Sequence, residues 1–522
     1  MTIQKLALKV GSAAIAKNDL VQIAEGGKLW PVITKRFSAI GTMDYESGVD
    51  NVSGQLSQAN TVCECLYFNE TTLDKIVLSP ISENLTNNQG LVLKVYNEQL
   101  TLTSSAIVTP DLTVISSKPI MKPLSNGNLL LLWKETTTSY YAVYDQQLNA
   151  IVVKTTLGDV EIESVATKSA GGFAILTRNG DDLSLALYSN TGTVVLAPAI
   201  INTSVDATAK GSAIAELSDG KLIIAIRSGT FNVQQAIFTS AGVAEGAFTN
   251  IVGITGGDKT RFSISVIAGF YCIVAEAVNQ VTAAVFNNTG TLLNYNNGFF
   301  LYQSLSDNTT YDSFVVNDGS YFWVVRFTRA AMAENSYIGL LRLAKDGNNG
   351  NNKTYRYAFN SIALDHNATL GKTNVQGFYK NNTLVFNYEN TMVIISIENY
   401  LPKNISYVAN GSFFASAIAA AHDGAIFRLG RVYDVSPTSL ILLEGKYTNS
   451  AIMGIALESL NAGNEGALIN INIAAGSFNC NTLIGTDCFF NHSSDQYQYP
   501  TLKQGLLLDN AVLISQTSLG TP

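Results

Sequence analysis

Residues 171–198 read GGFAILTRNGDDLSLALYSNTGTVVLAP, which is two apolar segments joined by the polar gap NGDD and followed by the turn Asn190-Thr191-Gly192. The segments FAIL and LALY are mainly apolar at consecutive positions, whereas a strand with one face in water would alternate apolar and polar residues. Glycine in such turns supplies the positive φ that tight hairpins require. The stretch therefore predicts a β-hairpin that is buried on both faces.

The same unit recurs from about residue 63 to residue 410. Clear copies pair KLIIAIRS with VQQAIFTS, FYCIVAEA with VTAAVFNN, and YFWVVRFT with SYIGLLRLA. Weaker copies pair LLLLWKE with SYYAVYDQ, TLVFNYE with MVIISIEN, and KIVLSPI with LVLKVYN. The second strand of each unit starts at residues 91, 139, 183, 233, 281, 336 and 392, so the period is near 50 residues. A period of about 40–50 residues with short strands and hairpin glycines indicates the blades of a β-propeller.

Stacking explains why the central strands are apolar on both sides, because a four-stranded blade cannot bury both faces alone. We therefore predict an all-β protein with a seven-bladed β-propeller over residues 63–410. A stack of β-sandwiches is the alternative, since it also contains short strands at intervals of about 8–12 residues. The regular recurrence over seven units favours the propeller. A closed ring also predicts that the segments before and after it lie close together.

The flanking segments do not follow the unit but share a pattern with each other, SAIGT at 38–42 and SAIMGIAL at 450–457. Each is accompanied by glycine-containing turns and short apolar segments, which is typical of small β-barrels. We expect an N-terminal β-module for attachment or assembly over 1–60, a β-barrel module over 411–475, and a C-terminal β-module over 476–522.

Composition narrows the classes of function. Of the 522 residues, 47% are hydrophobic and only 14% are charged, so the surface must be built largely from uncharged polar residues. The net charge of −8 argues against binding to nucleic acid, which gathers Lys and Arg on one face. No apolar run reaches the roughly 20 residues of a spanning helix, and the N-terminus lacks the apolar core of a secretory signal. We therefore expect no membrane insertion.

One stretch of the C-terminal region, SAIMGIALESLNAGNEGALININIAAG at 450–476, resembles the small β-modules of tailed-phage tail fibres, head fibres and decoration proteins. In those modules a GIAL strand precedes a glycine-containing turn and a strand rich in valine or isoleucine. Residues 485–515 are similar to fibre segments with a GTxYYV strand and a closing GxAL strand. The resemblance covers about 120 residues. It implies a virion protein, assembled in the host cytoplasm and exposed on the particle, with other virion proteins as partners.

Catalytic patterns are absent from the sequence. The three histidines are isolated, and none lies near a G-x-S-x-G motif. A propeller glycosidase would need paired carboxylates, but the candidates stand at hairpin turns, where turn chemistry explains them; they are Glu135, Asp181, Asp182, Asp219 and Asp318. The five cysteines predict buried thiols or a Cys480–Cys488 disulfide, and not a zinc site. We predict no enzyme, no cofactor and no metal site.

Aromatic residues in or beside the blade strands are the candidates for ligand binding, because sugars stack on flat rings that carry a polar group. Core packing between blades is the alternative role for them. The candidates are Trp133, Tyr140, Tyr141, Tyr321 and Trp323.

These features favour a non-enzymatic structural and recognition component of a phage virion, such as a tail or head fibre or decoration protein, that is homo-oligomeric and binds a host cell-surface glycan. A propeller glycoside hydrolase or lyase acting on host polysaccharide is one alternative, and a secreted lectin-like propeller is another. The five aromatic residues above are the predicted ligand-binding positions of the virion component and of the lectin-like propeller.

Overall fold

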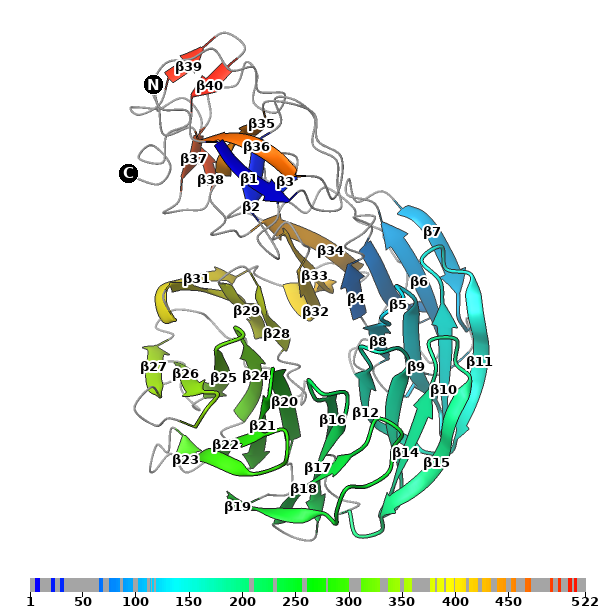
Figure 1. Cartoon of the computed structure of the whole chain (residues 1–522). Helices are drawn as coiled ribbons and strands as arrows, with labels where there is room; N and C mark the ends of the chain where they lie inside the picture. Colours follow the sequence, from blue (N-terminus) through cyan, green and yellow to red (C-terminus); the bar gives the residue numbers. More distant parts are fainter. Residues whose placement is uncertain are drawn as a thin grey trace.

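The computed structural model is built from β-strands arranged as a ring of sheets with a smaller group of strands beside it (Figure 1). Between residues 119 and 358 it describes residues 119–205, 211–228, 232–255, 261–277, 280–299, 311–328, 337–347 and 352–358; elsewhere it describes the strands named below and residues 108, 109, 113, 115, 116 and 400. Every regular element in these residues is a strand, and none is a helix long and apolar enough to cross a membrane.

Seven four-stranded antiparallel sheets follow one another along the chain, each with its strands in chain order. They are sheet 1, β4 (Cys65–Phe68), β5 (Lys75–Asn84), β6 (Asn88–Tyr96) and β7 (Leu102–Ile107); sheet 2, β8 (Ile120–Pro123), β9 (Leu129–Glu135), β10 (Thr138–Tyr144) and β11 (Ala150–Gly158); sheet 3, β12 (Glu161–Thr167), β13 (Phe173–Asn179), β14 (Asp182–Tyr188) and β15 (Val194–Asn202); sheet 4, β16 (Ser212–Glu216), β17 (Leu222–Ser228), β18 (Asn232–Phe238) and β19 (Thr249–Thr255); sheet 5, β20 (Arg261–Ile267), β21 (Phe270–Ala277), β22 (Gln280–Asn287) and β23 (Leu292–Phe299); sheet 6, β24 (Tyr311–Asn317), β25 (Tyr321–Thr328), β26 (Tyr337–Ala344) and β27 (Lys353–Ala358); and sheet 7, β28 (Gln376–Lys380), β29 (Thr383–Tyr388), β30 (Thr391–Glu398) and β31 (Leu401–Ala409).

The first strands of consecutive sheets lie side by side around an axis, as in β12 against β16 and β16 against β20. A three-stranded sheet of β32 (Phe413–Ala420), β33 (Ala425–Val432) and β34 (Ser439–Lys446) lies between sheet 7 and sheet 1, because β32 contacts both β28 and β4. This ring of radially stacked sheets is the architecture of a β-propeller. The all-β propeller prediction is confirmed at that level, but a ring closed by seven blades and small flanking barrels are not confirmed.

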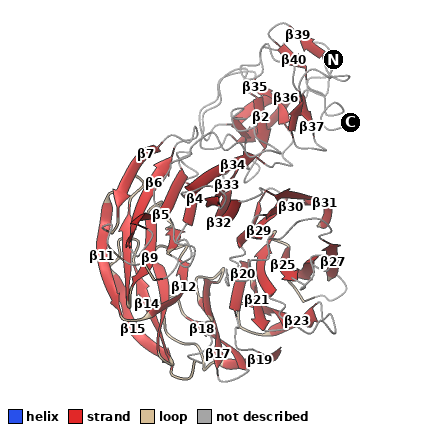
Figure 2. Cartoon of the chain, turned by 180° about the vertical axis from the view of Figure 1, so that it is seen from behind, coloured by secondary structure: helices blue, strands red, loops and turns tan. Residues whose placement is uncertain are grey.

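The two ends of the chain share one five-stranded sheet beside the ring, in the order β1-β36-β35-β2-β3 (Figure 2). Its strands are β1 (Lys5–Lys9), β2 (Leu20–Ile23), β3 (Leu29–Pro31), β35 (Ile452–Ala456) and β36 (Glu465–Asn470). The terminal segments therefore lie together, as a closed ring predicts. Within segment 411–475, expected to form one barrel module, β32 contacts sheets 7 and 1, and β35 and β36 belong to the shared sheet; the module stays a prediction.

Two further hairpins follow in the C-terminal region, β37 (Phe489–Asn491) with β38 (Gln496–Gln498), and β39 (Leu506–Leu508) with β40 (Ala511–Leu513). Cys480, Cys488 and the three histidines lie outside the described residues. The proposed disulfide therefore stays a prediction. Cys272 is a free, fully buried thiol in β21.

Among the described residues, the core lies between the sheets, in six hydrophobic clusters that each join two consecutive sheets. The central strands show why: five consecutive residues of β9 and six of β17 are buried. Such strands can be apolar throughout because both faces pack against neighbours. The continuous apolar segments in the sequence thus reflect contact with two blades at once.

We call one end of the ring the turn face; where the structure describes them, the connections between the first and second and between the third and fourth strands of a sheet lie at this end. In sheet 3 the second of these turns contains Gly192, whose φ is +72°. A Cβ atom at Gly192 would lie 2.4 Å from Cγ2 of Val152 in sheet 2, so no larger residue fits. Gly347 of sheet 6 stands in the same relation to Leu293 of sheet 5. The turn glycines therefore serve both hairpin geometry and blade contact.

Candidate ligand-binding site

The structure divides the five predicted aromatic residues into two groups. Trp133, Tyr141 and Trp323 are buried in the clusters between sheets. Their rings contact core side chains and present no surface to a ligand. Tyr140 and Tyr321 are half-buried and stand where strands β10 and β25 begin. Only these two are placed to contact a ligand.

Tyr321 lies on the turn face, beside a turn that a buried tryptophan holds in place. Asp318 accepts a hydrogen bond at Oδ2 from Nε1 of Trp323, at 2.8 Å. Its other carboxylate oxygen accepts from the backbone N–H groups of Ser320, at 2.8 Å, and Tyr321, at 2.7 Å. One carboxylate thus ties the turn to the core and fixes the start of β25.

A second tyrosine from the next sheet lies beside Tyr321. The ring of Tyr400 is 4.9 Å from that of Tyr321, centroid to centroid, with 59° between the ring planes. The guanidinium carbon of Arg342 lies 4.5 Å from the Tyr321 ring centroid, and Arg342 donates through Nη1 to the carbonyl oxygen of Tyr400. The Ser320 hydroxyl donates to the Tyr400 hydroxyl at 3.4 Å. We call Ser320, Tyr321, Arg342 and Tyr400 the tyrosine patch.

Tyr400 has an unfavourable backbone conformation for a residue of its kind. Glu398 pairs with Leu401 across a tight turn that contains Tyr400, and the φ of Tyr400 is +60°. Tight hairpin turns favour glycine at such a position, because the left-handed conformation costs other residues about 1–2 kcal/mol. The side chain remains 43% exposed, so burial does not compensate fully. Backbone strain clusters at ligand-binding and active sites, so Tyr400 becomes a candidate ligand contact, although exposed Thr136 also has a positive φ, of +48°.

Two other pairs of sheets are also joined through turns of the turn face. In sheets 2 and 3, Nδ2 of Asn190 donates to the Ser125 hydroxyl at 3.1 Å. In sheets 4 and 5, Nδ2 of Asn288 donates to the Ser218 hydroxyl at 2.9 Å. Each contact joins a serine of one sheet's first turn to a residue of the next sheet's second turn. Sheets 6 and 7 are joined by a contact of Ser320 with Tyr400 that is built differently. Ser320 follows the turn glycine, whereas Ser125 and Ser218 precede it. Tyr400 has the positive φ that Gly192 and Gly290 have in the second turns of sheets 3 and 5.

The electrostatic surroundings of the patch keep a third phenol neutral. Burial raises the pKa of Tyr379, and the negative charge of Asp318 and the nearby Tyr400 add to that rise. Nζ of Lys345 donates to the carbonyl oxygen of Gly319 at 3.3 Å. The site therefore combines flat apolar rings with hydroxyl, guanidinium and carboxylate groups. That combination can stack on one face of a sugar and hydrogen-bond its hydroxyl groups.

Tyr140, the other half-buried candidate, has its ring occupied by neighbouring side chains. Trp133 stacks on it at 5.8 Å between centroids, and Nζ of Lys154 lies 4.1 Å from its centroid. Glu135 holds both neighbours, accepting from Nε1 of Trp133 at 2.7 Å and from Lys154 at 2.5 Å. This arrangement stabilises sheet 2 and leaves little of the Tyr140 ring for a ligand.

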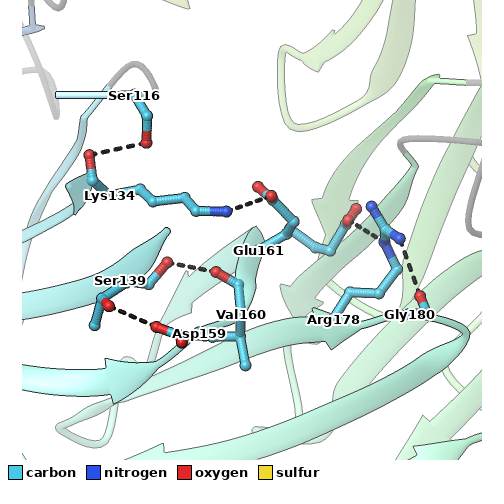
Figure 3. A network of polar contacts seen from close by, with 10 residues as sticks. Ser116, Lys134, Ser139, Asp159, Val160, Glu161, Arg178 and Gly180 are labelled. Atoms are coloured by element: carbon cyan, nitrogen blue, oxygen red, sulfur yellow. Dashed lines mark hydrogen bonds and ion pairs between the residues drawn. The ribbon is translucent and has the colours of Figure 1, made fainter. Parts of the chain in front are cut away.

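The carboxylates of sheets 2 and 3 lie in a polar network at the end of the ring opposite the turn face (Figure 3). Lys134 is paired with Glu161, and Nε of Arg178 donates to Glu163 at 2.7 Å. Glu163 also accepts from the backbone N–H of Ser212 in sheet 4, at 3.3 Å. Each of these contacts joins neighbouring strands or sheets. Among the residues that the structure describes, no group of three or more His, Cys, Asp or Glu could hold a metal ion.

The remaining carboxylates singled out in the sequence have turn roles where their contacts are given. Asp219 accepts from the backbone N–H of Lys221 at 3.2 Å, and Asp318 caps its turn as described above. The contact given for Asp181 is made by its backbone carbonyl oxygen, which accepts from the backbone N–H of Val205 at 3.2 Å, and not by its carboxylate. The contacts of Asp219 and Asp318 agree with the turn chemistry that the sequence indicates.

Sequence reasoning missed Tyr400, Arg342 and Tyr379. Tyr400 stands in ENYLPK, at a turn and outside the apolar strand pair that defines the repeat. A signal was present, because the sequence has an Asn-Tyr pair at a tight turn where Asn-Gly is favoured. Arg342 lies in the apolar run YIGLLRLA, and nothing in that run indicates its ring partner.

No family model and no curated protein sequence matches the chain. Solved structures that are similar to it are propellers. They include the Dos1 propeller, at 11% identity and a TM-score of 0.45, over 78% of this chain and 95% of that one. The β-propeller domain of the Trilobed protease from Pyrococcus furiosus matches at 9% identity and a TM-score of 0.38, over 76% and 97%. Virginiamycin B lyase from Staphylococcus aureus matches at 13% and 0.40, over 64% and 94%. At these identities the likeness concerns the fold and not activity.

Proposed function

We propose that this chain is a non-enzymatic recognition component of a phage virion, and that its propeller binds a host cell-surface glycan at the tyrosine patch. In this proposal the seven four-stranded sheets are the blades, and β32–β34 completes the ring. The sheet shared by the two chain ends attaches the protein to other virion proteins. The propeller is then exposed on the particle surface.

The observation that carries the ligand site is the strained, exposed tyrosine at the contact between sheets 6 and 7. Two other pairs of sheets are joined, turn to turn, by an asparagine that donates to a serine. Sheets 6 and 7 instead have a tyrosine in a strained conformation, with its ring exposed beside a second tyrosine. The inter-sheet contact alone does not require an aromatic ring. We explain the strained backbone and exposed ring of Tyr400 by a ligand that binds to the ring.

A glycan fits the patch better than a charged or deeply buried ligand. Tyr400 is 43% exposed, and the turn beside Tyr321 is held by hydrogen bonds to Asp318. Sugars bind such surfaces weakly, one site at a time. A particle with several copies gains avidity, since linked sites raise the effective concentration of the ligand.

The virion assignment rests on the resemblance at 450–476 and 485–515 and on the low-charge composition. The shared terminal sheet supports it as well, because both chain ends emerge at one place from which a particle could hold the ring. Immuno-electron microscopy of the source particles, with antibody to the propeller, tests it. Label on the particle surface is expected, and particles that lack the protein would contradict the proposal.

The ligand assignment is tested by titrating host surface polysaccharide into the wild-type protein and two variants. Tyr400→Gly removes one ring and relaxes the backbone, so it should fold normally and weaken binding at least tenfold, which corresponds to about 1.4 kcal/mol. Tyr295→Ala is the matched control, because Tyr295 is an exposed tyrosine on β23 outside the patch. It should bind like wild type.

The same incubation separates recognition from catalysis. If the protein only binds, the polysaccharide keeps its length after prolonged incubation. Shortened products would support a propeller hydrolase or lyase instead. Equal binding by wild type and Tyr400→Gly would show that the ligand, if any, lies elsewhere.

A further inference from the structure

The outer strands of sheets 1, 2 and 3 carry exposed aliphatic side chains. Six of them are between 41% and 72% exposed; they are Ile107 of β7, Ile151 and Val153 of β11, and Val194, Val195 and Ile200 of β15. Figures 1 and 2 place these three strands along the same outer edge of the ring. We call this edge the aliphatic rim.

The rim is nearly free of charge. β7, β11 and β15 contain six, nine and nine residues, and Lys154 is their only charged side chain. Nζ of Lys154 bonds to Oε2 of Glu135 at 2.5 Å, so this charge is neutralised. Exposed outer strands usually carry lysines or other charges that prevent association. The rim carries valine and isoleucine at its exposed positions instead, so it lacks this protection.

Another described outer strand differs. In β19 of sheet 4, Ile251 is buried and the exposed positions include Thr249 and Asn250. Among the residues whose exposure is described, the other exposed apolar side chains of outer strands are Tyr295 of β23 and Leu401 of β31, so the exposed valines and isoleucines of outer strands gather on three consecutive sheets. An exposed apolar stretch confined to one side of a protein marks an interaction surface.

We propose that the rim is where a second copy of this chain binds, rim against rim about a twofold axis. Two copies that each carry a net charge of −8 repel one another, and the repulsion is smallest where the surface is neutral. A basic partner would instead be drawn to acidic surface. A twofold contact brings the same patch of both copies together, so an apolar strip without charge is complementary to itself.

The contact is made by side chains and not by extension of the sheet. Pro198 lies in the middle of β15 and has no N–H to donate, and the pairing of β14 with β15 shifts register there. A continuous ladder between two copies of β15 is therefore interrupted. Valine and isoleucine on either side of Pro198 remain available for packing.

Sedimentation equilibrium of the full-length protein over a range of concentrations tests the proposal. The rim variant carries Val153→Lys, Val195→Lys and Ile200→Lys, and the control carries Val243→Lys. Val243 is 63% exposed but lies in a turn of sheet 4, outside the rim. All four positions are exposed, and melting curves verify that both variants fold.

Wild type and control are expected to dimerise, with the rim variant at least tenfold weaker. Added salt should strengthen the wild-type dimer, because it screens repulsion between like-charged copies and leaves apolar contact intact. A wild-type protein that is monomeric at every concentration would overturn the proposal. This holds also if a different protein covers the rim in the particle. A rim variant that dimerises as tightly as the control would overturn it too.

Discussion

Replacing Trp323 by alanine tests the link between the propeller core and the tyrosine patch. Its ring is fully buried between sheets 6 and 7, where Phe386 and Val393 belong to the same cluster. Its Nε1 also donates to Asp318, which holds the backbone of Ser320 and Tyr321. The substitution therefore removes a core side chain and an anchor of the site together.

The lost packing and the lost hydrogen bond lower the unfolding free energy by different amounts. Truncation of a buried tryptophan to alanine costs about 3–5 kcal/mol, since it removes apolar contacts and leaves a cavity. The hydrogen bond to Asp318 adds about 1 kcal/mol, because water can reach a turn carboxylate when the donor is gone. Trp323→Phe keeps most of the ring and loses the donor. We expect it to cost about 1–2 kcal/mol.

Equilibrium unfolding in urea measures both variants, with the free energy taken from the midpoint and the slope. The expected order is wild type, then Trp323→Phe, then Trp323→Ala, with glycan affinity reduced already in the phenylalanine variant. A loss of unfolding free energy below about 1 kcal/mol for Trp323→Ala would refute the reasoning, because truncation of a fully buried tryptophan destabilises a protein by more than that. Unchanged affinity in Trp323→Phe would show that Asp318 holds the patch without it.

Three further predictions concern buried groups elsewhere in the ring. Glu163→Gln breaks the buried pair with Arg178 and should lower the unfolding free energy by about 3–5 kcal/mol, as measured in urea. Burial, with a smaller effect of Tyr141, raises the pKa of Tyr188 from 10.0 to about 12. The neutral Tyr188 phenol therefore contributes its full stability below pH 10, and this contribution is lost between pH 10 and 12. Tyr188→Phe should lessen that loss in alkaline melting curves. Burial also raises the pKa of the Cys272 thiol, which should react with a thiol reagent only after unfolding.

The ring was predictable because its signal is repeated. A buried strand that contacts two blades must be apolar at consecutive positions, and the turn glycines mark where each hairpin ends. Sheet 3 shows both features within 28 residues, from Gly171 to Pro198. The three-stranded sheet at 413–446 was predicted to lie in a separate barrel, although Asp423-Gly424 stands between its first two strands as Asp219-Gly220 does in sheet 4. Only spatial contact with β28 and β4 shows its place.

The candidate site was only partly predictable. Tyr321 was found because it begins an apolar strand, but an aromatic residue in such a strand is equally expected in the core, where Trp133 and Trp323 lie. Tyr400 contributes through its backbone conformation and through a neighbour about 80 residues away in the chain. Neither property is visible in residue type or spacing, since both arise when sheets 6 and 7 pack together.

The measurement that tests the central claim most directly is a structure of the protein in complex with an oligosaccharide from the host surface. We predict a sugar ring stacked on Tyr400, with its hydroxyl groups within hydrogen-bond distance of Ser320 or Tyr321. A sugar bound at the opposite end of the ring, beside the network of Lys134, Glu161 and their neighbours, would contradict the proposed site.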